Sequence, residues 1–199
     1  MTKIVSEMKN ERKKLEIEKD EAAVKSFQYF FFKRWRKKTD SQWIHPNKVI
    51  RFNMLFNTNI DGDSASTFHY NCDGIFPTVV VILDTDGRKF GGFSTQNWCQ
   101  SAVGGNYSRA PNSFIFNLTN KEKFELTDQF ENNAVYRNNS YGPTFGGGYD
   151  INLYNQCKSN KNSYCSKSSY NTGNNNVLGI NGSTSFQVSN YEVYQVIYE

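Results

Sequence analysis

The chain has 199 residues, enough for one domain or one domain with an appendage, and its 16 Phe, 12 Tyr and 3 Trp can supply a large core. The net charge of +4 comes from residues 1–38, which hold 12 Lys/Arg against 6 Asp/Glu, whereas residues 39–199 hold 11 against 13. A nearly neutral domain excludes a general nucleic-acid-binding fold, so we expect no specific nucleic-acid partner.

We expect the amino-terminal segment to be neither a secretory signal peptide nor a membrane span. Met1–Lys14 reaches charged residues at once, unlike a secretory signal peptide. The longest uncharged apolar run, Ser26–Phe32, is too short to cross a bilayer. We therefore expect a cytoplasmic protein without a transmembrane segment. The abundance of Asn, Lys, Tyr and Phe is typical of an AT-rich genome, such as that of a protist.

Composition places a boundary near residue 40. Residues 1–45 contain no Gly and no Pro, whereas Pro46 and Gly62 open a stretch dense in both. The earlier part is rich in Lys and Glu and poor in β-branched residues, which favours helix. We predict a helical extension over residues 1–40 and a domain over residues 41–199.

The second half of the extension interleaves aromatic and basic side chains. On a helix the rings would cover so wide an arc that more than one side must be buried. Such a helix can dock on its own domain, anchor a protein partner, lie in a membrane surface or bind nucleic acid. The candidate partner-binding residues are Phe27, Tyr29, Phe30, Phe31, Phe32, Arg34, Trp35 and Arg36.

Two short helices are predicted at the start of the domain. The first begins at His45-Pro46, where the missing proline N–H costs nothing. The second follows the acidic turn 59–63, with Asp63 or Ser64 as its cap, and directs Cys72 toward the core. The first helix would bury an apolar stripe of Val49, Phe52, Leu55 and Phe56.

Strands fill the rest of the domain. Thr78–Leu83 is a β-branched run typical of a strand buried on both faces. Asp84–Gly87 is a hairpin turn into a partner strand, Arg88–Phe93, in which Gly91-Gly92 indicates a bulge or a close backbone approach. Further strands are predicted at Ser113–Leu118, Phe124–Leu126, Tyr149–Tyr154, Ser185–Val188 and Glu192–Tyr198, with an irregular one near Ser163–Cys165 or Ser168–Tyr170.

These elements predict an α+β fold that is mainly β. Several antiparallel strands with helices placed early indicate a two-sheet antiparallel β-sandwich flanked by short helices and preceded by the N-terminal helical extension. The last strand carries apolar residues on both faces, as a strand inside a covered sheet does.

The residue types of catalysis occur without the spacing that catalysis needs. The sequence contains no nucleophile elbow, Walker A or dinucleotide fingerprint. His69 and Cys72 could form a nucleophilic pair, but a reactive thiolate needs an exposed, electropositive setting. The four cysteines lack zinc or disulfide spacing and are expected to be free thiols. We predict a binding module rather than an enzyme, with no catalytic residue, cofactor or metal.

A series of motifs runs through the domain in a fixed order: Asp61–His69, Cys72-Asp73-Gly74, Pro77-Thr78, Gly87, Phe90–Phe93, Trp98, Ser113–Phe116, Gly142–Asp150, Phe186-Gln187-Val188 and Glu192-Val193-Tyr194. Together they resemble the TLDc domain family over roughly residues 41–199. The resemblance implies a β-sandwich flanked by helices, with no established catalytic activity and no agreed site residues. It also implies an association with protection against oxidative stress and with binding of the V-type ATPase, which some members help to disassemble. We expect Gly142-Pro143-Thr144 and Gly146-Gly147-Gly148 to be fold-defining turns.

Three functions stay open. The first is a non-enzymatic protein-binding module that acts on V-type ATPase subunits or in the oxidative-stress response. The second is a structural component of a large assembly, such as a cytoskeletal or ciliary microtubule array, anchored by the N-terminal helix. The third is a cysteine-dependent enzyme that uses His69 and Cys72.

Overall fold

The computed structural model describes residues 42–199, and residues 48–199 form one compact unit. Two six-stranded sheets make up this unit, and all of their strand pairs are antiparallel. The predicted two-sheet sandwich with few short helices is confirmed. The helical extension predicted over residues 1–40 lies outside the described residues.

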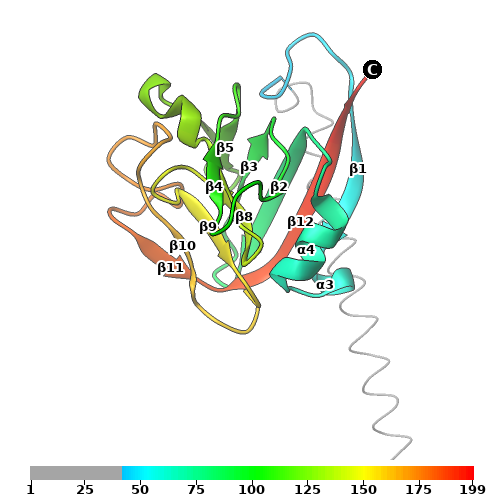
Figure 1. Ribbon diagram of the computed structural model, residues 1–199. Coiled ribbons are helices and arrows are strands. Elements are labelled where there is room, and N and C mark those ends of the chain that lie inside the picture. Colours follow the sequence, from blue (N-terminus) through cyan, green and yellow to red (C-terminus); the bar gives the residue numbers. More distant parts are fainter. Residues whose placement is uncertain (1–41) are drawn as a thin grey trace, which may run out of the picture. The chain divides into compact units, whose positions relative to one another are not determined.

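The first sheet has the strand order β1-β12-β2-β3-β5-β6 (Figure 1). Its central strand β2 is buried along nearly its whole length, which confirms the prediction for the β-branched run 78–83. The strands of this sheet are β1 Ile50–Asn57, β2 Thr78–Asp84, β3 Lys89–Ser94, β5 Phe114–Asn117, β6 Glu122–Glu125 and β12 Val188–Tyr198.

The second sheet has the strand order β11-β10-β9-β8-β7-β4, and one hydrophobic cluster lies between it and the first sheet. Phe145 and Ile151 enter this core from the second sheet, and Val80 and Val193 enter it from the first. The strands are β4 Asn106–Ser108, β7 Val135–Arg137, β8 Tyr141–Phe145, β9 Ile151–Tyr154, β10 Ser163–Cys165 and β11 Thr184–Phe186.

Helices α3 Thr58–Asp61 and α4 Ala65–Cys72 lie beside β1 and β12 (Figure 1), and the 3-10 helix η1 Asp128–Asn133 precedes β7. The Ser64 hydroxyl caps α4 by accepting a hydrogen bond from the Thr67 N–H, as the sequence predicts. The buried side of α4 includes Phe68 and Cys72, so the predicted direction of that thiol is also confirmed.

The helix predicted from Pro46 is wrong, because residues 50–57 form strand β1 and pair with β12. A register shift between Met54 and Phe56 interrupts the alternation of this strand. Phe52 packs against Tyr194, whereas Phe56 lies in the core between the sheets. The extra residue of a bulge makes the side chains after it point to the opposite face from the one that strict alternation predicts. The apolar residues of β1 therefore fall at intervals that also fit one face of a helix.

The predicted hairpin at Asp84–Gly87 is confirmed. Gly87 has a φ of +83°, a conformation that glycine adopts without steric strain. The Asp84 carboxylate is buried and accepts hydrogen bonds from the backbone N–H groups of Asp86 and Arg88 and from the Arg88 Nε. The Asp84 side chain therefore stabilises the turn between β2 and β3.

Candidate functional site

The Cys72 side chain is inside the core and offers no accessible nucleophile. It is fully buried, and burial together with the charge of Asp73 raises the pKa of its thiol well above the ordinary value. The hydrogen-bond partners of His69 are Asp73, Asn138 and Tyr141. Its Nδ1 lies 2.8 Å from the Asp73 carboxylate, and its Nε2 lies 3.1 Å from the carbonyl oxygens of Asn138 and Tyr141. This histidine ties α4 to the loop between β7 and β8.

Two of the other three thiols are buried as well. All four cysteines are free thiols, as predicted, and Cys157 and Cys165 are buried. Burial raises the pKa of the Cys157 thiol to about 12 and that of Cys165 well above its ordinary value. Residues 42–199 bring together no group of three His, Cys, Asp or Glu side chains that could hold a metal ion. In the same range, no helix combines the length and apolarity that crossing a bilayer requires.

The Gly146–Asp150 motif builds a buried anchor between the β8–β9 turn and the loop after β10. The Asp150 carboxylate is fully buried and accepts hydrogen bonds from the backbone N–H groups of Ser168, Ser169 and Tyr170. Burial raises the pKa of Asp150, although these three N–H groups act in the opposite direction. The Gly147 N–H in turn donates to the Ser169 hydroxyl.

The two glycine motifs therefore have different roles. The glycine run 146–148 forms a turn, as predicted. Gly142-Pro143-Thr144 lies within strand β8, so the prediction of a turn there is wrong. A register shift between Tyr141 and Thr144 accommodates the proline, which cannot donate a ladder hydrogen bond.

Glu192 on β12 is a second carboxylate buried without a cation among the described residues. Its Oε1 accepts hydrogen bonds from the Asn57 and Asn190 side-chain amides, and its Oε2 accepts one from the Tyr194 hydroxyl. The Asn190 Oδ1 accepts from the hydroxyl of Thr58, so the network joins β12 to β1 and α3. Burial raises the pKa of the Glu192 carboxyl to about 7.

This carboxyl should make the stability of the domain depend on pH. The folded-state pKa of about 7 exceeds the ordinary value of 4.5, so the folded state binds the proton more tightly than the unfolded state. The contribution of Glu192 is fully present below pH 4.5 and falls by about 3 kcal/mol as pH rises to 7. Glu192→Gln should remove this slope in urea unfolding measured between pH 4.5 and 8.

The exposed Glu122 on β6 supplies the matched control, since Glu122→Gln removes a carboxyl that is already in water. It should leave the slope of the parent chain unchanged, which separates Glu192 from the other titrating groups. Equal slopes in Glu192→Gln and the parent chain would contradict the assignment.

The outer face of the second sheet carries tyrosines in one row. Tyr107 pairs with Tyr136 across β4 and β7, and Tyr164 pairs with Asn152 across β10 and β9. Asn152 also pairs with Thr144 on β8. Their strand neighbours, such as Val135, Phe145, Ile151 and Cys165, belong to the core, so the row points away from it.

Tyr149 joins this row from the β8–β9 turn. Its φ of +60° is uncommon for a residue with a large side chain. The ring centroid of Tyr149 lies 5.3 Å from that of Tyr136 and 6.0 Å from that of Tyr164. Tyr141 and Tyr154 extend the cluster, with ring centroids 5.7 Å apart. We call the six residues the tyrosine face: Tyr107, Tyr136, Tyr141, Tyr149, Tyr154 and Tyr164.

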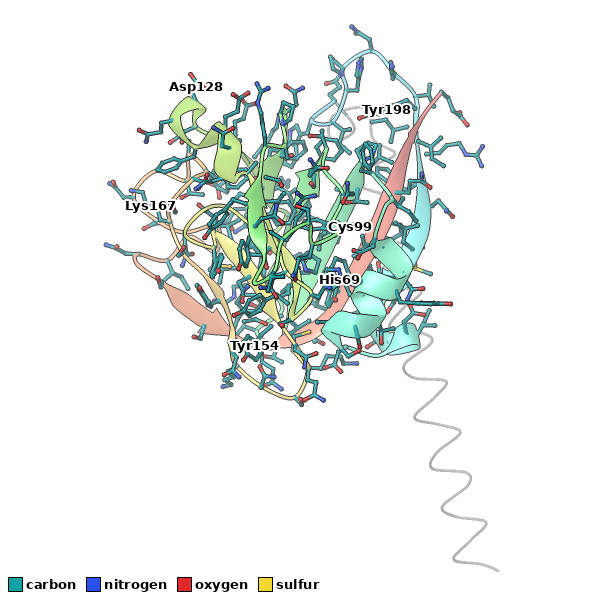
Figure 2. All side chains as sticks on the ribbon, in the orientation of Figure 1. His69, Cys99, Asp128, Tyr154, Lys167 and Tyr198 are labelled. Carbon is teal, nitrogen blue, oxygen red and sulfur yellow. The ribbon has the colours of Figure 1, made fainter. Side chains whose placement is uncertain are left out.

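The tyrosine face is partly open to solvent. Tyr107 and Tyr154 are each 39% exposed, and the other four tyrosines are half-buried. The Tyr107 hydroxyl donates to the Gly147 carbonyl oxygen, which holds one ring in place. Beneath the row, Asn152 is 1% exposed and its Oδ1 has no hydrogen-bond donor among residues 42–199. Figure 2 labels Tyr154 at the lower edge of the domain and Lys167 at its left side.

Sequence reasoning did not identify the tyrosine face, because its members come from five strands and a turn spread over 58 positions, 107 to 164. Only the strand register brings them together. The predicted partner-binding residues lie outside the described residues, so the structure leaves them as a prediction. They are Phe27, Tyr29, Phe30, Phe31, Phe32, Arg34, Trp35 and Arg36.

Comparison with known proteins finds one family and two similar curated proteins. The TLDc domain model matches residues 36–197. MTOR-associated protein MEAK7 of Danio rerio is 44% identical over 45 residues, which cover 23% of this chain and 10% of that protein. MTOR-associated protein MEAK7 of Mus musculus is 26% identical over 98 residues, which cover 49% of this chain and 21% of that protein. The matches thus span less than a quarter of either relative.

Proposed function

This chain belongs to the TLDc domain family, and we propose that it acts as a non-enzymatic protein-binding module. The tyrosine face is the observation that carries the proposal. Tyrosine supplies a large rigid ring and a hydroxyl at low entropic cost, and it is enriched in the cores of protein interfaces. The Cys72 thiol and the Asp150 and Glu192 carboxylates, in contrast, are buried in structural contacts.

The finer proposal is that the module binds subunits of the V-type ATPase in the oxidative-stress response. It rests on family membership, because members of the TLDc family are associated with both. The two relatives are named for association with MTOR, which makes MTOR a further candidate to look for among captured proteins.

The second candidate is a structural component of a cytoskeletal or ciliary microtubule array. The aromatic and basic residues between Phe27 and Arg36 favour it, because such a segment can anchor a domain to a larger assembly. Under this hypothesis, residues 1–40 anchor the protein to the assembly. The domain, residues 41–199, is held on the assembly by that anchor.

Affinity purification distinguishes the two candidates. Three baits are compared: the full chain, residues 41–199 alone, and the full chain with Phe30, Phe31 and Trp35 each replaced by Ser. We expect residues 41–199 to recover V-type ATPase subunits as well as the full chain does. Recovery of cytoskeletal proteins that is lost in both altered baits would instead favour the assembly component. Capture of no specific protein by any bait would contradict both.

A further inference from the structure

We propose that the tyrosine face binds an acidic, proline-rich segment of a partner protein in the polyproline II conformation. This inference rests on the proposed binding function and names the chemistry of the bound segment. An extended segment would cross the strands of the second sheet, from Tyr107 on β4 to Tyr164 on β10. The acidic residues of the segment would lie at the β10 end.

The groups on the face match a polyproline helix. Neighbouring rings of the six are tilted against one another by 43° to 60°, with centroids 4.8 to 6.4 Å apart. Tilted rings leave ridges between which pyrrolidine rings can pack. A polyproline helix offers solvated carbonyl acceptors without internal hydrogen bonds. The hydroxyls of Tyr107 and Tyr136 already donate to the carbonyl oxygens of Gly147 and Gly104, so the donors for the segment would come from the other four tyrosines.

The dimensions of the row set the length of the segment. Tyr107 and Tyr164 are separated by four strand spacings in the order β4-β7-β8-β9-β10. At about 4.8 Å per spacing the row spans about 19 Å. A polyproline helix rises about 3.1 Å per residue, so about six residues, or two turns, would cover the row.

Charge at one end of the row determines which end of the segment is acidic. Lys161 precedes β10 and Lys167 follows it, and both side chains are exposed. Neither lysine forms an ion pair within residues 42–199, so both positive charges are available to a partner. At the opposite edge, Arg109 is already paired with Glu131, and the half-buried Arg137 donates to the Ser101 hydroxyl.

Two other occupants fit less well. A carbohydrate needs acceptors for its many hydroxyl groups, and the one side-chain acceptor left free beneath the row, Asn152 Oδ1, is covered by the protein. A second copy stacked with β10 against β10 would place the lysines of one face against those of its partner, a like-charge contact that disfavours this arrangement.

Fluorescence anisotropy of the full chain tests the proposal with two labelled peptides of about ten residues, one all proline and one with a glutamate-rich end. We expect saturable binding of both and tighter binding of the acidic one. Tyr107→Ser combined with Tyr154→Ser should weaken both complexes at least about tenfold, because each ring contributes to the apolar contact. Lys161→Glu combined with Lys167→Glu should weaken only the acidic peptide.

The matched control is Tyr70→Ser, since Tyr70 on α4 is 90% exposed and lies outside the tyrosine face. It should bind both peptides as the parent chain does. Thermal unfolding should show that the tyrosine variant is still folded at the temperature of the binding assay, although it loses the hydrogen bond from Tyr107 to Gly147. Absence of saturable binding, or binding that Tyr107→Ser/Tyr154→Ser leaves unchanged, overturns the proposal.

Two results separate this inference from the proposed function. If residues 41–199 capture a protein that the Tyr107→Ser/Tyr154→Ser variant captures equally, the module function stands and the tyrosine face is not its docking site. If sedimentation shows a dimer that the same variant abolishes, with no peptide bound, the face belongs to a second copy. Either result overturns the proline-rich assignment.

Discussion

Replacing Gly91 with alanine should lower the free energy of unfolding by about 3 kcal/mol or more, enough to unfold much of a marginally stable domain. Gly91 lies in β3, between Val81 of β2 and Phe116 of β5. A Cβ atom there would lie 2.0 Å from the Val80 carbonyl oxygen and 3.0 Å from the Phe116 ring. A backbone oxygen in a central strand cannot retreat without breaking the ladder. Urea unfolding followed by circular dichroism measures the loss.

Two other glycines serve as comparisons that separate the steric cost of Gly91→Ala from other costs of replacing glycine. At Gly92 an added Cβ would lie 2.6 Å from the Phe145 ring, a side chain, so Phe145→Leu should restore part of the stability that Gly92→Ala loses. No such rescue exists for Gly91. At Gly104, with a φ of +82° and open space around it, alanine should cost about 1 kcal/mol from the left-handed backbone alone. A Gly91→Ala loss no larger than that of Gly104→Ala would refute the steric argument.

Gly91-Gly92 also shows how much of the fold can be predicted from the sequence. Glycine inside a strand indicates a bulge or a close approach, and the structure has the close approach. The register between β2 and β3 is continuous from Thr78 to Leu83, so the bulge alternative is wrong. The central strands were predictable because burial on both faces leaves a continuous apolar run in the sequence.

Elements with mixed composition were not predictable in the same way. A bulge gives β1 the spacing of a helix, and a proline interrupts β8. Strands β4 and β7 have three residues each and form only because their neighbours offer ladder hydrogen bonds. Pairing with neighbouring strands, and not local propensity, determines the secondary structure of such segments.

The buried carboxylates and the tyrosine face escaped prediction for a related reason. Glu and Asp are almost never fully buried unless they are paired, so nothing in the residue types of Glu192 or Asp150 indicates burial. Each is buried because groups distant in the sequence, such as Asn57 or the 168–170 loop, supply its hydrogen bonds. The tyrosine face likewise depends on a register that no local pattern contains.

Replacing Asp150 with alanine should lower the free energy of unfolding by about 3–5 kcal/mol, because a buried donor left without its acceptor costs about 1–3 kcal/mol. Three such donors, the N–H groups of Ser168, Ser169 and Tyr170, would lose the same carboxylate. The loop should also lose its position, and with it the hydrogen bond that the buried Tyr170 hydroxyl donates to the Ala134 carbonyl oxygen. Urea unfolding measures the first effect, and hydrogen exchange of residues 166–170 measures the second.

Asparagine at position 150 separates hydrogen bonding from shape. With its oxygen in the place of Oδ1 it keeps an acceptor for all three N–H groups and loses only the 2.9 Å bond from Ser169 N to Oδ2. We expect Asp150→Asn to cost about 1–2 kcal/mol, because its amide NH₂ faces that N–H. Since burial raises the pKa of Asp150, the stability of the parent falls as this carboxyl ionises, and the deficit of Asp150→Asn should shrink with rising pH. If alanine costs no more than asparagine, the anchor holds the loop by packing rather than by accepting hydrogen bonds.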